Sequence, residues 1–160
     1  MARLEKMHPA MRASLLAMEC PVFDSHPWAA GPPLHQRRVA LISTAGLHRR
    51  DDRPFAVTSG NSRAIAGDYR VIPGDTAAND LVMSHVSTNF DRTGFQQDWN
   101  VVLPLDSLHG LAAQGVIGSV AAFHYSFMGA TDPKHMEPAA HDLARLLAQD
   151  HVNAVCLVPV

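Results

Sequence analysis

Two histidines of the chain stand at places where an imidazole could act on a substrate. His85 follows a short apolar segment and opens a polar loop, so we predict that it acts as a general acid or orients the substrate, because an imidazole titrates near neutral pH. His124 lies within the apolar residues 121–127, where it could support catalysis. For both, the alternative is a hydrogen-bonded histidine that only stabilises the core.

A second set of polar residues follows the first apolar run of the chain. Ser43 and Thr44 could donate hydrogen bonds to a substrate carboxylate, and Gly46 would let the backbone come close to it. His48 follows beside two arginines, where it could help to bind an anion. We therefore predict substrate binding at these four positions. The alternatives are a strand end that uses Ser and Thr to turn, and an exposed basic turn at His48.

A polar loop supplies two further candidates. Asn89 and Asp91 could orient a substrate amine or a histidine, and we expect Asn89 to bind substrate and Asp91 to support catalysis. The alternative is a solvated loop. Cys156 lies in an apolar run, so we expect a buried, unreactive thiol with a raised pKa and not the nucleophile.

The histidines and cysteines do not predict a metal site. All ten histidines occur singly, and the two cysteines, Cys20 and Cys156, are far apart in the sequence. A site made by His48, His85 and His124 would require the three side chains to converge within about 4 Å of one point.

The candidate site residues are far apart in the sequence, so strands and helices must bring them together. The patterns of apolar residues predict an α/β fold. Strands are expected at residues 39–44, 69–72, 121–127 and 152–160, and helices at 75–83, 106–114 and 138–149. This alternation predicts a three-layer arrangement, with helices flanking a mostly parallel sheet whose last strand is buried.

The N-terminal region differs from the rest. Residues 1–34 combine a short helix with a connection rich in Pro and Gly, in which we expect Trp28 to contact the core. We therefore predict an irregular arm at 1–34 and an α/β domain at 35–160.

Charge and composition exclude some classes of partner. The 160 residues are 47% hydrophobic and carry a net charge of −2, so there is no overall attraction to nucleic acid or to an anionic membrane. No apolar run reaches the roughly 20 residues of a membrane span, and a signal-peptide pattern is lacking. We expect a cytoplasmic protein.

Three segments of the chain carry a resemblance to a known family. They are residues 39–48, residues 91–118 with Asn-Val-Val-Leu-Pro-Leu-Asp at 100–106 and Gly-Val-Ile-Gly at 115–118, and Phe-Met-Gly at 127–129. Together they resemble the selenoprotein B family, the selenoprotein subunits of glycine, sarcosine, betaine and D-proline reductases. The resemblance covers roughly residues 27–160.

The resemblance implies a reductase whose nucleophile is outside these residues. In that family a strand similar to residues 153–160 leads into a U-x-x-C or C-x-x-C motif, where U is selenocysteine. It implies reductive cleavage of a C–N bond in a small amine or amino acid, with a pyruvoyl-containing subunit and a thiol electron donor as partners, in an oligomer. We expect a reading frame closed at a selenocysteine UGA codon, so that residues 35–160 would be the first half of a longer two-lobed protein; the alternative is a natural or engineered truncation at this point. We also expect a chain that is inactive as it stands and contains no cofactor.

Other functions remain open at this point. A non-catalytic domain of the same fold could bind a small acid or act as a scaffold, using residues 44–48. Racemase-like chemistry would need two acid/base groups facing one substrate carbon, and Cys156 with one histidine is the available pair.

Overall fold

The structure is a computed structural model that describes residues 3–17, 30–55, 67–87, 90–129 and 133–160, together with residues 19, 22, 24, 26 and 28. Its strands are β1 (Arg38–Ser43), β2 (Leu47–Arg49), β3 (Tyr69–Pro73), β4 (Leu81–Met83), β5 (Ser119–Val120), β6 (Phe123–Phe127) and β7 (Ala154–Val158). Its α-helices are α1 (Pro9–Leu16), α2 (Thr93–Gln97), α3 (Leu105–Ala113) and α4 (Glu137–Gln149). Short 3-10 helices occupy Leu4–Lys6, Leu34–Gln36, Ala78–Asp80, Trp99–Val101 and Pro133–His135.

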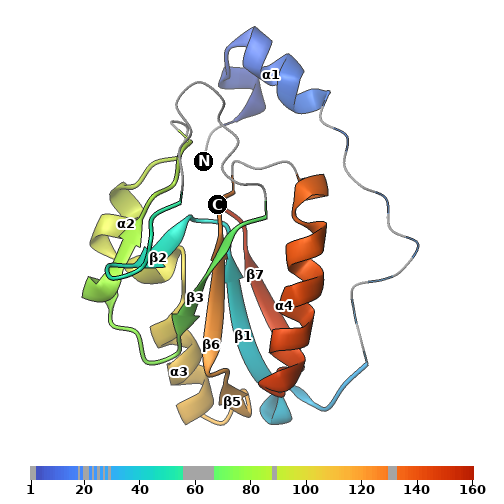
Figure 1. The fold of residues 1–160 in the computed structure, drawn as a ribbon, viewed down its shortest axis with the longest axis vertical. Coiled ribbons are helices and arrows are strands. Elements are labelled where there is room, and N and C mark those ends of the chain that lie inside the picture. The colour runs from blue at the N-terminus through green and yellow to red at the C-terminus, as the bar shows by residue number, and fades with distance from the viewer. Residues whose placement is uncertain are drawn as a thin grey trace.

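Five strands form one mostly parallel sheet around β1 (Figure 1). The strands β5, β6 and β7 all run parallel to β1, and β3 is antiparallel to β6. The predicted α/β class and the mostly parallel sheet are therefore confirmed. Strands β2 and β4 form a separate antiparallel pair beside it.

Residues of β1 alternate between two clusters of apolar side chains. Val39 and Leu41 pack with Leu105 and Leu108 of α3. Ile42, on the opposite face, packs in the cluster around α4. This alternation is the period of two of a strand, and it explains why β1 is apolar at nearly every position.

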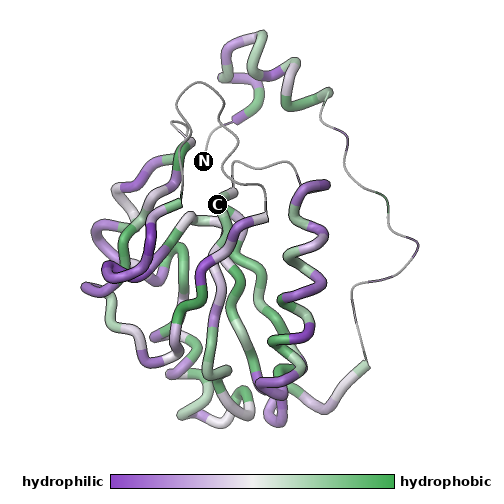
Figure 2. Tube along the Cα trace, in the orientation of Figure 1, coloured by the Kyte–Doolittle hydropathy of each residue, from purple (hydrophilic) through white to green (hydrophobic). Residues whose placement is uncertain are grey.

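Helix α4 confirms the predicted spacing of leucines. Leu143 is buried against Tyr125 and Phe127 of β6, while Leu146 and Leu147 are partly buried beside it. Figure 2 shows apolar residues along the strands and polar residues interspersed along α4. Of the described helices, none is long and apolar enough to cross a bilayer.

Several local predictions were wrong. The helix expected at 75–83 is a 3-10 turn followed by β4, because Leu81–Met83 pairs with β2. The terminal strand is not buried: β7 pairs with β1 alone among the described strands, and Cys156 is exposed instead of buried. Trp28 does not contact the core, since it is 91% exposed. Apolar sequence alone could not reveal that one edge of the sheet is open.

A mismatch in register interrupts the pairing along β1. Val39 pairs with Val120 of β5, and Ile42 pairs with Tyr125 of β6. Three steps along β1 therefore correspond to five steps along the neighbouring segment. The two extra residues form a bulge between β5 and β6.

Candidate functional site

The carboxyl ends of β1, β6 and β7 meet at one edge of the sheet, the place where open α/β sheets hold their ligands. The Thr44 hydroxyl accepts a hydrogen bond from the Val160 N–H at 2.8 Å and donates one to the Val160 carbonyl at 3.3 Å. The Thr44 N–H donates to the carbonyl of Val158 at 3.1 Å. From β6, the Gly129 N–H donates to the Thr44 carbonyl at 2.8 Å. Thr44 thus fixes the backbone at Val160.

Two glycines stand at this edge where a side chain would collide. A Cβ atom at Gly129 would lie 2.7 Å from the carbonyl oxygen of Thr44 and 2.8 Å from that of Val160. At Gly46, φ is +65° and a Cβ would lie 3.2 Å from Cα of His85. Gly46 therefore allows a close approach, as predicted, but the group that comes close is the backbone of His85.

We expect Thr44→Val to release the backbone at Val160. Valine keeps the shape of threonine but loses the hydroxyl, so the Val160 amide should exchange with solvent about fivefold faster, the loss expected for a hydrogen bond worth about 1 kcal/mol. Amide exchange followed by NMR measures this. Thr44→Ser, which keeps the hydroxyl, should retain the protection, and equal exchange in all three proteins would contradict the role assigned to the hydroxyl.

Ser43, the other hydroxyl residue predicted to bind substrate, also forms a hydrogen bond with the protein backbone. Oγ of Ser43, which is fully buried, accepts from the Ala45 N–H at 3.2 Å. On the neighbouring strand, Oγ of Ser126 accepts from the Leu47 N–H at 2.8 Å. The hydroxyls of Ser43 and Thr44 are therefore engaged within the protein, and substrate binding by either residue stays a prediction.

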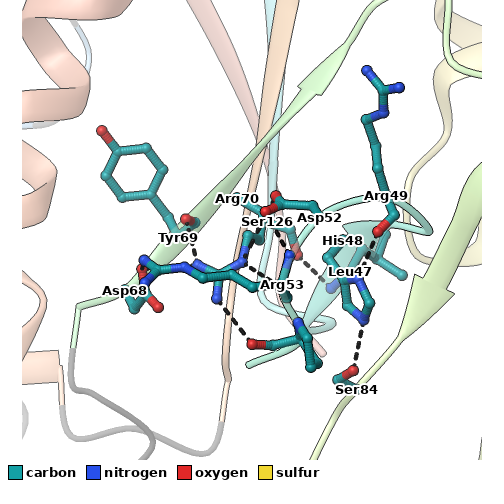
Figure 3. A network of polar contacts seen from close by, with 11 residues as sticks. Leu47, His48, Arg49, Asp52, Arg53, Asp68, Tyr69, Arg70, Ser84 and Ser126 are labelled. Carbon is teal, nitrogen blue, oxygen red and sulfur yellow. Dashed lines mark hydrogen bonds and ion pairs between the residues drawn. The ribbon is translucent and has the colours of Figure 1, made fainter. Parts of the chain in front are cut away.

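His48 lies within β2 and not in an exposed turn. Its side chain is buried, with Nδ1 2.7 Å from the carbonyl of Arg49 and Nε2 2.8 Å from Oγ of Ser84 (Figure 3). Because a carbonyl can only accept, Nδ1 carries the proton, and in the neutral imidazole Nε2 accepts from the Ser84 hydroxyl. This pairing joins β2 to the residue that follows β4. The predicted contact of His48 with a substrate is untested.

His85 follows Ser84 and is also buried. Its Nδ1 accepts from the Ser87 N–H at 3.2 Å, so the proton of the neutral ring is on Nε2, which has no hydrogen-bond partner among the described residues. The ring lies 5.1 Å from that of Phe90. Burial, and then the charge of Arg92, lower the pKa of His85. A neutral imidazole with a free N–H, close to Gly46, can donate a hydrogen bond to a ligand, so its predicted role is chemically possible.

The last two candidates, Asn89 and Asp91, follow His85 in the sequence. Asp91 is exposed and accepts a hydrogen bond from the Thr93 N–H at 2.9 Å, and hydrogen bonding to Thr93 lowers the pKa of Asp91. It therefore stabilises the start of α2. Asn89 lies outside the described residues, so its place in the site is untested.

His124 lies away from this edge. Its ring is completely buried, and Nδ1 accepts from the Leu41 N–H at 3.0 Å in the middle of β1. Nε2 has no partner among the described residues. Burial lowers its pKa to about 4, with a smaller effect of His109. Beside the bulge, the imidazole accepts the hydrogen bond that a backbone carbonyl of the neighbouring strand would otherwise accept. This position favours a histidine that stabilises the core over the predicted catalytic role.

Arg70 is a buried charge that the sequence did not single out. It is 3% exposed, and its Nη1 lies 2.8 Å from Asp68 and its Nε 3.9 Å from Asp52 (Figure 3). The guanidinium also lies 4.3 Å from the centre of the Phe55 ring. It also donates to the backbone carbonyls of Arg53, Pro54 and Tyr69. Arg70 thereby fastens the segment after β2 onto β3. A signal existed in the sequence, since an arginine within the apolar strand 69–72 requires partners.

The structure therefore brings Thr44 and Gly46 together with His85, and joins His48 to this group through Ser84. His124 is separate from them. No group of three or more His, Cys, Asp or Glu side chains in the described part of the chain could hold a metal ion. The arrangement offers a fixed backbone at Val160 and a neutral imidazole nearby. It can position a reactive group and donate one hydrogen bond, but the described residues contain no activated nucleophile at this edge.

Comparison with known proteins identifies the family. The family described as glycine/sarcosine/betaine reductase selenoprotein B matches residues 16–160. The chain is 34% identical over 128 residues to the D-proline reductase subunit gamma of Acetoanaerobium sticklandii, which covers 78% of the chain and 49% of that relative. It is 30% identical over 140 residues to the sarcosine reductase complex component B subunit beta of Peptoclostridium acidaminophilum, covering 86% of the chain and 31% of the relative.

The chain thus spans about half of the length of the first relative and about a third of the second. No solved structure matches it. Both relatives are named as subunits of reductases, and the family match covers all of the described strands. The chain belongs to the glycine/sarcosine/betaine reductase selenoprotein B family.

Proposed function

We propose that the chain is the N-terminal part of a selenol- or thiol-dependent reductase that cleaves a C–N bond of a small amino-acid-like substrate. Membership of the family carries the proposal, together with the names of the two relatives, a D-proline reductase and a sarcosine reductase. The redox residue would follow Val160, and a selenolate or thiolate there would supply the nucleophile for reductive cleavage. The residues described here would then be the surroundings of the reactive group.

The geometry at the carboxyl edge of the sheet supports this role. Thr44 fixes Val160 through two hydrogen bonds, and Gly129 leaves room for their two carbonyl groups. A residue attached to Val160 would therefore start from an ordered backbone at the edge where such sheets bind their ligands. His85 would orient the substrate through its free Nε2–H, with Asn89 and Asp91 in the loop that follows.

The wider proposal covers the setting of the reaction. The partners would be a pyruvoyl-containing subunit that holds the substrate amine and a thiol electron donor, within a cytoplasmic oligomer. The fold of the longer protein would have helices in layers on both sides of the sheet, with residues 1–34 as a Pro/Gly-rich arm. The non-catalytic alternative is less well supported, because Thr44 and His48, which it uses to bind an acid, form internal hydrogen bonds.

The first test reads the DNA directly after codon 160. We expect TGA, followed by a cysteine codon three positions further on and by sequence that continues an α/β pattern. A TAA or TAG codon, or the lack of both a downstream cysteine and such a continuation, would overturn the proposal.

The second test measures turnover. Extending the chain through that codon with selenocysteine should give reductant-dependent release of amine from glycine, sarcosine or betaine, or ring opening of D-proline, when the pyruvoyl-containing subunit and a dithiol are present. Cysteine at the same codon should give slower turnover, and serine or the 160-residue chain none, because only an ionisable selenol or thiol can be the nucleophile. An extended protein without turnover on any of these substrates would refute the proposed activity.

A further inference from the structure

The face of the sheet that carries α4 is apolar and exposed to solvent next to β7. A groove of about 460 Å³ lies between α4 and the end of β7. Leu157 on β7 is 70% exposed, and Val155, two residues earlier on the same face, is 41% exposed. The residues that line the groove and matter here are Ile42, Phe127, Leu143, Ala144, Leu147 and Leu157.

The backbone of β7 is open on the same side. All five of its residues pair with β1, from Val39↔Ala154 to Ser43↔Val158, and no other described strand pairs with it. In Figure 1 β7 lies at the margin of the sheet, on the side of β1 opposite to β6 and β3. A parallel strand is normally covered on both faces, and an exposed edge strand is normally short, charged or covered, whereas β7 has a free edge and the exposed apolar residues Val155 and Leu157.

The direction of the chain indicates what is missing. Helix α4 connects β6 to β7, two strands parallel to β1, so the chain crosses over β1 toward the open edge. Crossovers between parallel strands are right-handed in nearly all proteins. A further parallel strand outside β7 continues the same direction, and its preceding helix would therefore lie on the same face as α4. That face is the one on which the groove and the exposed Leu157 lie.

We infer that this face binds a helix and a following parallel strand supplied by the polypeptide that accounts for the remaining length of the relatives. We call this polypeptide the companion segment. The helix would lie beside α4 on Leu157, where the small side chains of Ala140 and Ala144 allow close approach, and the strand would pair with the free edge of β7. The matched region is only 49% and 31% of the two relatives, so a segment of sufficient length exists in both. That the companion segment is encoded directly after codon 160 rests on the proposed function.

The test mixes the 160-residue chain with a separately produced companion segment, the polypeptide read from the codons that follow codon 160, with cysteine at a selenocysteine codon. We expect a one-to-one complex, measured by titration calorimetry, and slower amide exchange along β7 on binding. Leu157→Lys and Ala144→Glu should each weaken the complex at least about tenfold, because docking would bury an unpaired charge. Both residues are exposed in the isolated chain, and glutamate is a good helix former, so at least the second variant should fold.

Ala148→Glu is the matched control, since Ala148 is exposed on α4 but does not line the groove. It should change the affinity less than twofold. The absence of a complex, or a complex that tolerates both groove variants, would overturn the inference. So would a dimer of the 160-residue chain that is lost in Leu157→Lys, because the groove would then hold a second copy. No substrate is used, so binding without turnover would refute only the proposed function.

Discussion

Replacing Arg70 by methionine should destabilise the fold by about 3 kcal/mol or more, the cost of removing one partner from a buried ion pair. Methionine fills much of the volume but leaves Asp68 without its 2.8 Å partner and leaves the carbonyls of Arg53 and Pro54 without a donor. Urea unfolding followed by circular dichroism measures the change as a lower midpoint with an unchanged slope.

Arg145→Met provides the matched control. Arg145 is paired with Asp142, but its side chain is 75% exposed, and exposed pairs contribute at most about 1 kcal/mol. Arg70→Lys should lie between the two, because lysine keeps the charge but has three N–H donors on one nitrogen in place of the five that the planar guanidinium spreads over three nitrogens. If Arg70→Met and Arg145→Met unfold at the same urea concentration, the network in Figure 3 does not stabilise the fold.

Lowering the pH from 7 to 4 should cost about 3 kcal/mol of stability through His124 alone. Burial lowers the pKa of His124 from 6.5 to about 4. Above pH 6.5 the ring is neutral in both states, so stability is unaffected. Between pH 6.5 and 4 the unfolded chain binds a proton that the folded chain does not, so stability falls as the pH falls, by about 1.4 kcal/mol for each pH unit.

The variant His124→Asn tests this directly by urea unfolding at several pH values. The asparagine oxygen can still accept from the Leu41 N–H but does not titrate, so the variant should be less stable at pH 7 and lose less on acidification. His141→Asn is the control, because the side chain of His141 is 80% exposed. An identical pH dependence in His124→Asn and the unmodified chain would show that another group causes the acid sensitivity.

Patterns of apolar residues predicted the elements that form the centre of the fold. The run at residues 39–44 predicted β1, because a strand packed on both faces is apolar throughout, and the spacing of Leu143, Leu146 and Leu147 predicted α4, because that helix buries one face. The two three-residue strands β2 and β4 were missed, since segments of that length carry no recognisable period. The exposure of β7 depends on what pairs with its outer edge, which the residues of the strand cannot reveal.

The sequence predicted which residues lie at the end of the first strand better than it predicted what their side chains bind. Thr44 and Gly46 were correctly placed at the end of the first strand, but the hydroxyl of Thr44 binds Val160, 116 positions away in the chain. Contacts of this range depend on the order of the strands, which local sequence does not encode. Gly129 entered the sequence analysis only as part of the Phe-Met-Gly segment that resembles the family. A glycine is required there because two carbonyl groups come close to its Cα, and no spacing rule predicts such a contact.

The bulge between β5 and β6 bears on how the chain selects one alignment of its strands. Sliding β6 by one residue along β1 would turn Tyr125 to the wrong face, so burial alone prevents it. Sliding by two residues would keep every side chain on its own face, and hydrophobicity could not distinguish the two alignments. The hydrogen bond between the Leu41 N–H and His124 forms in only one of them. The imidazole thus helps to select the native alignment of the central strands, together with the hydrogen bond between the Leu47 N–H and Ser126, and variants that lose it should populate misaligned forms during refolding.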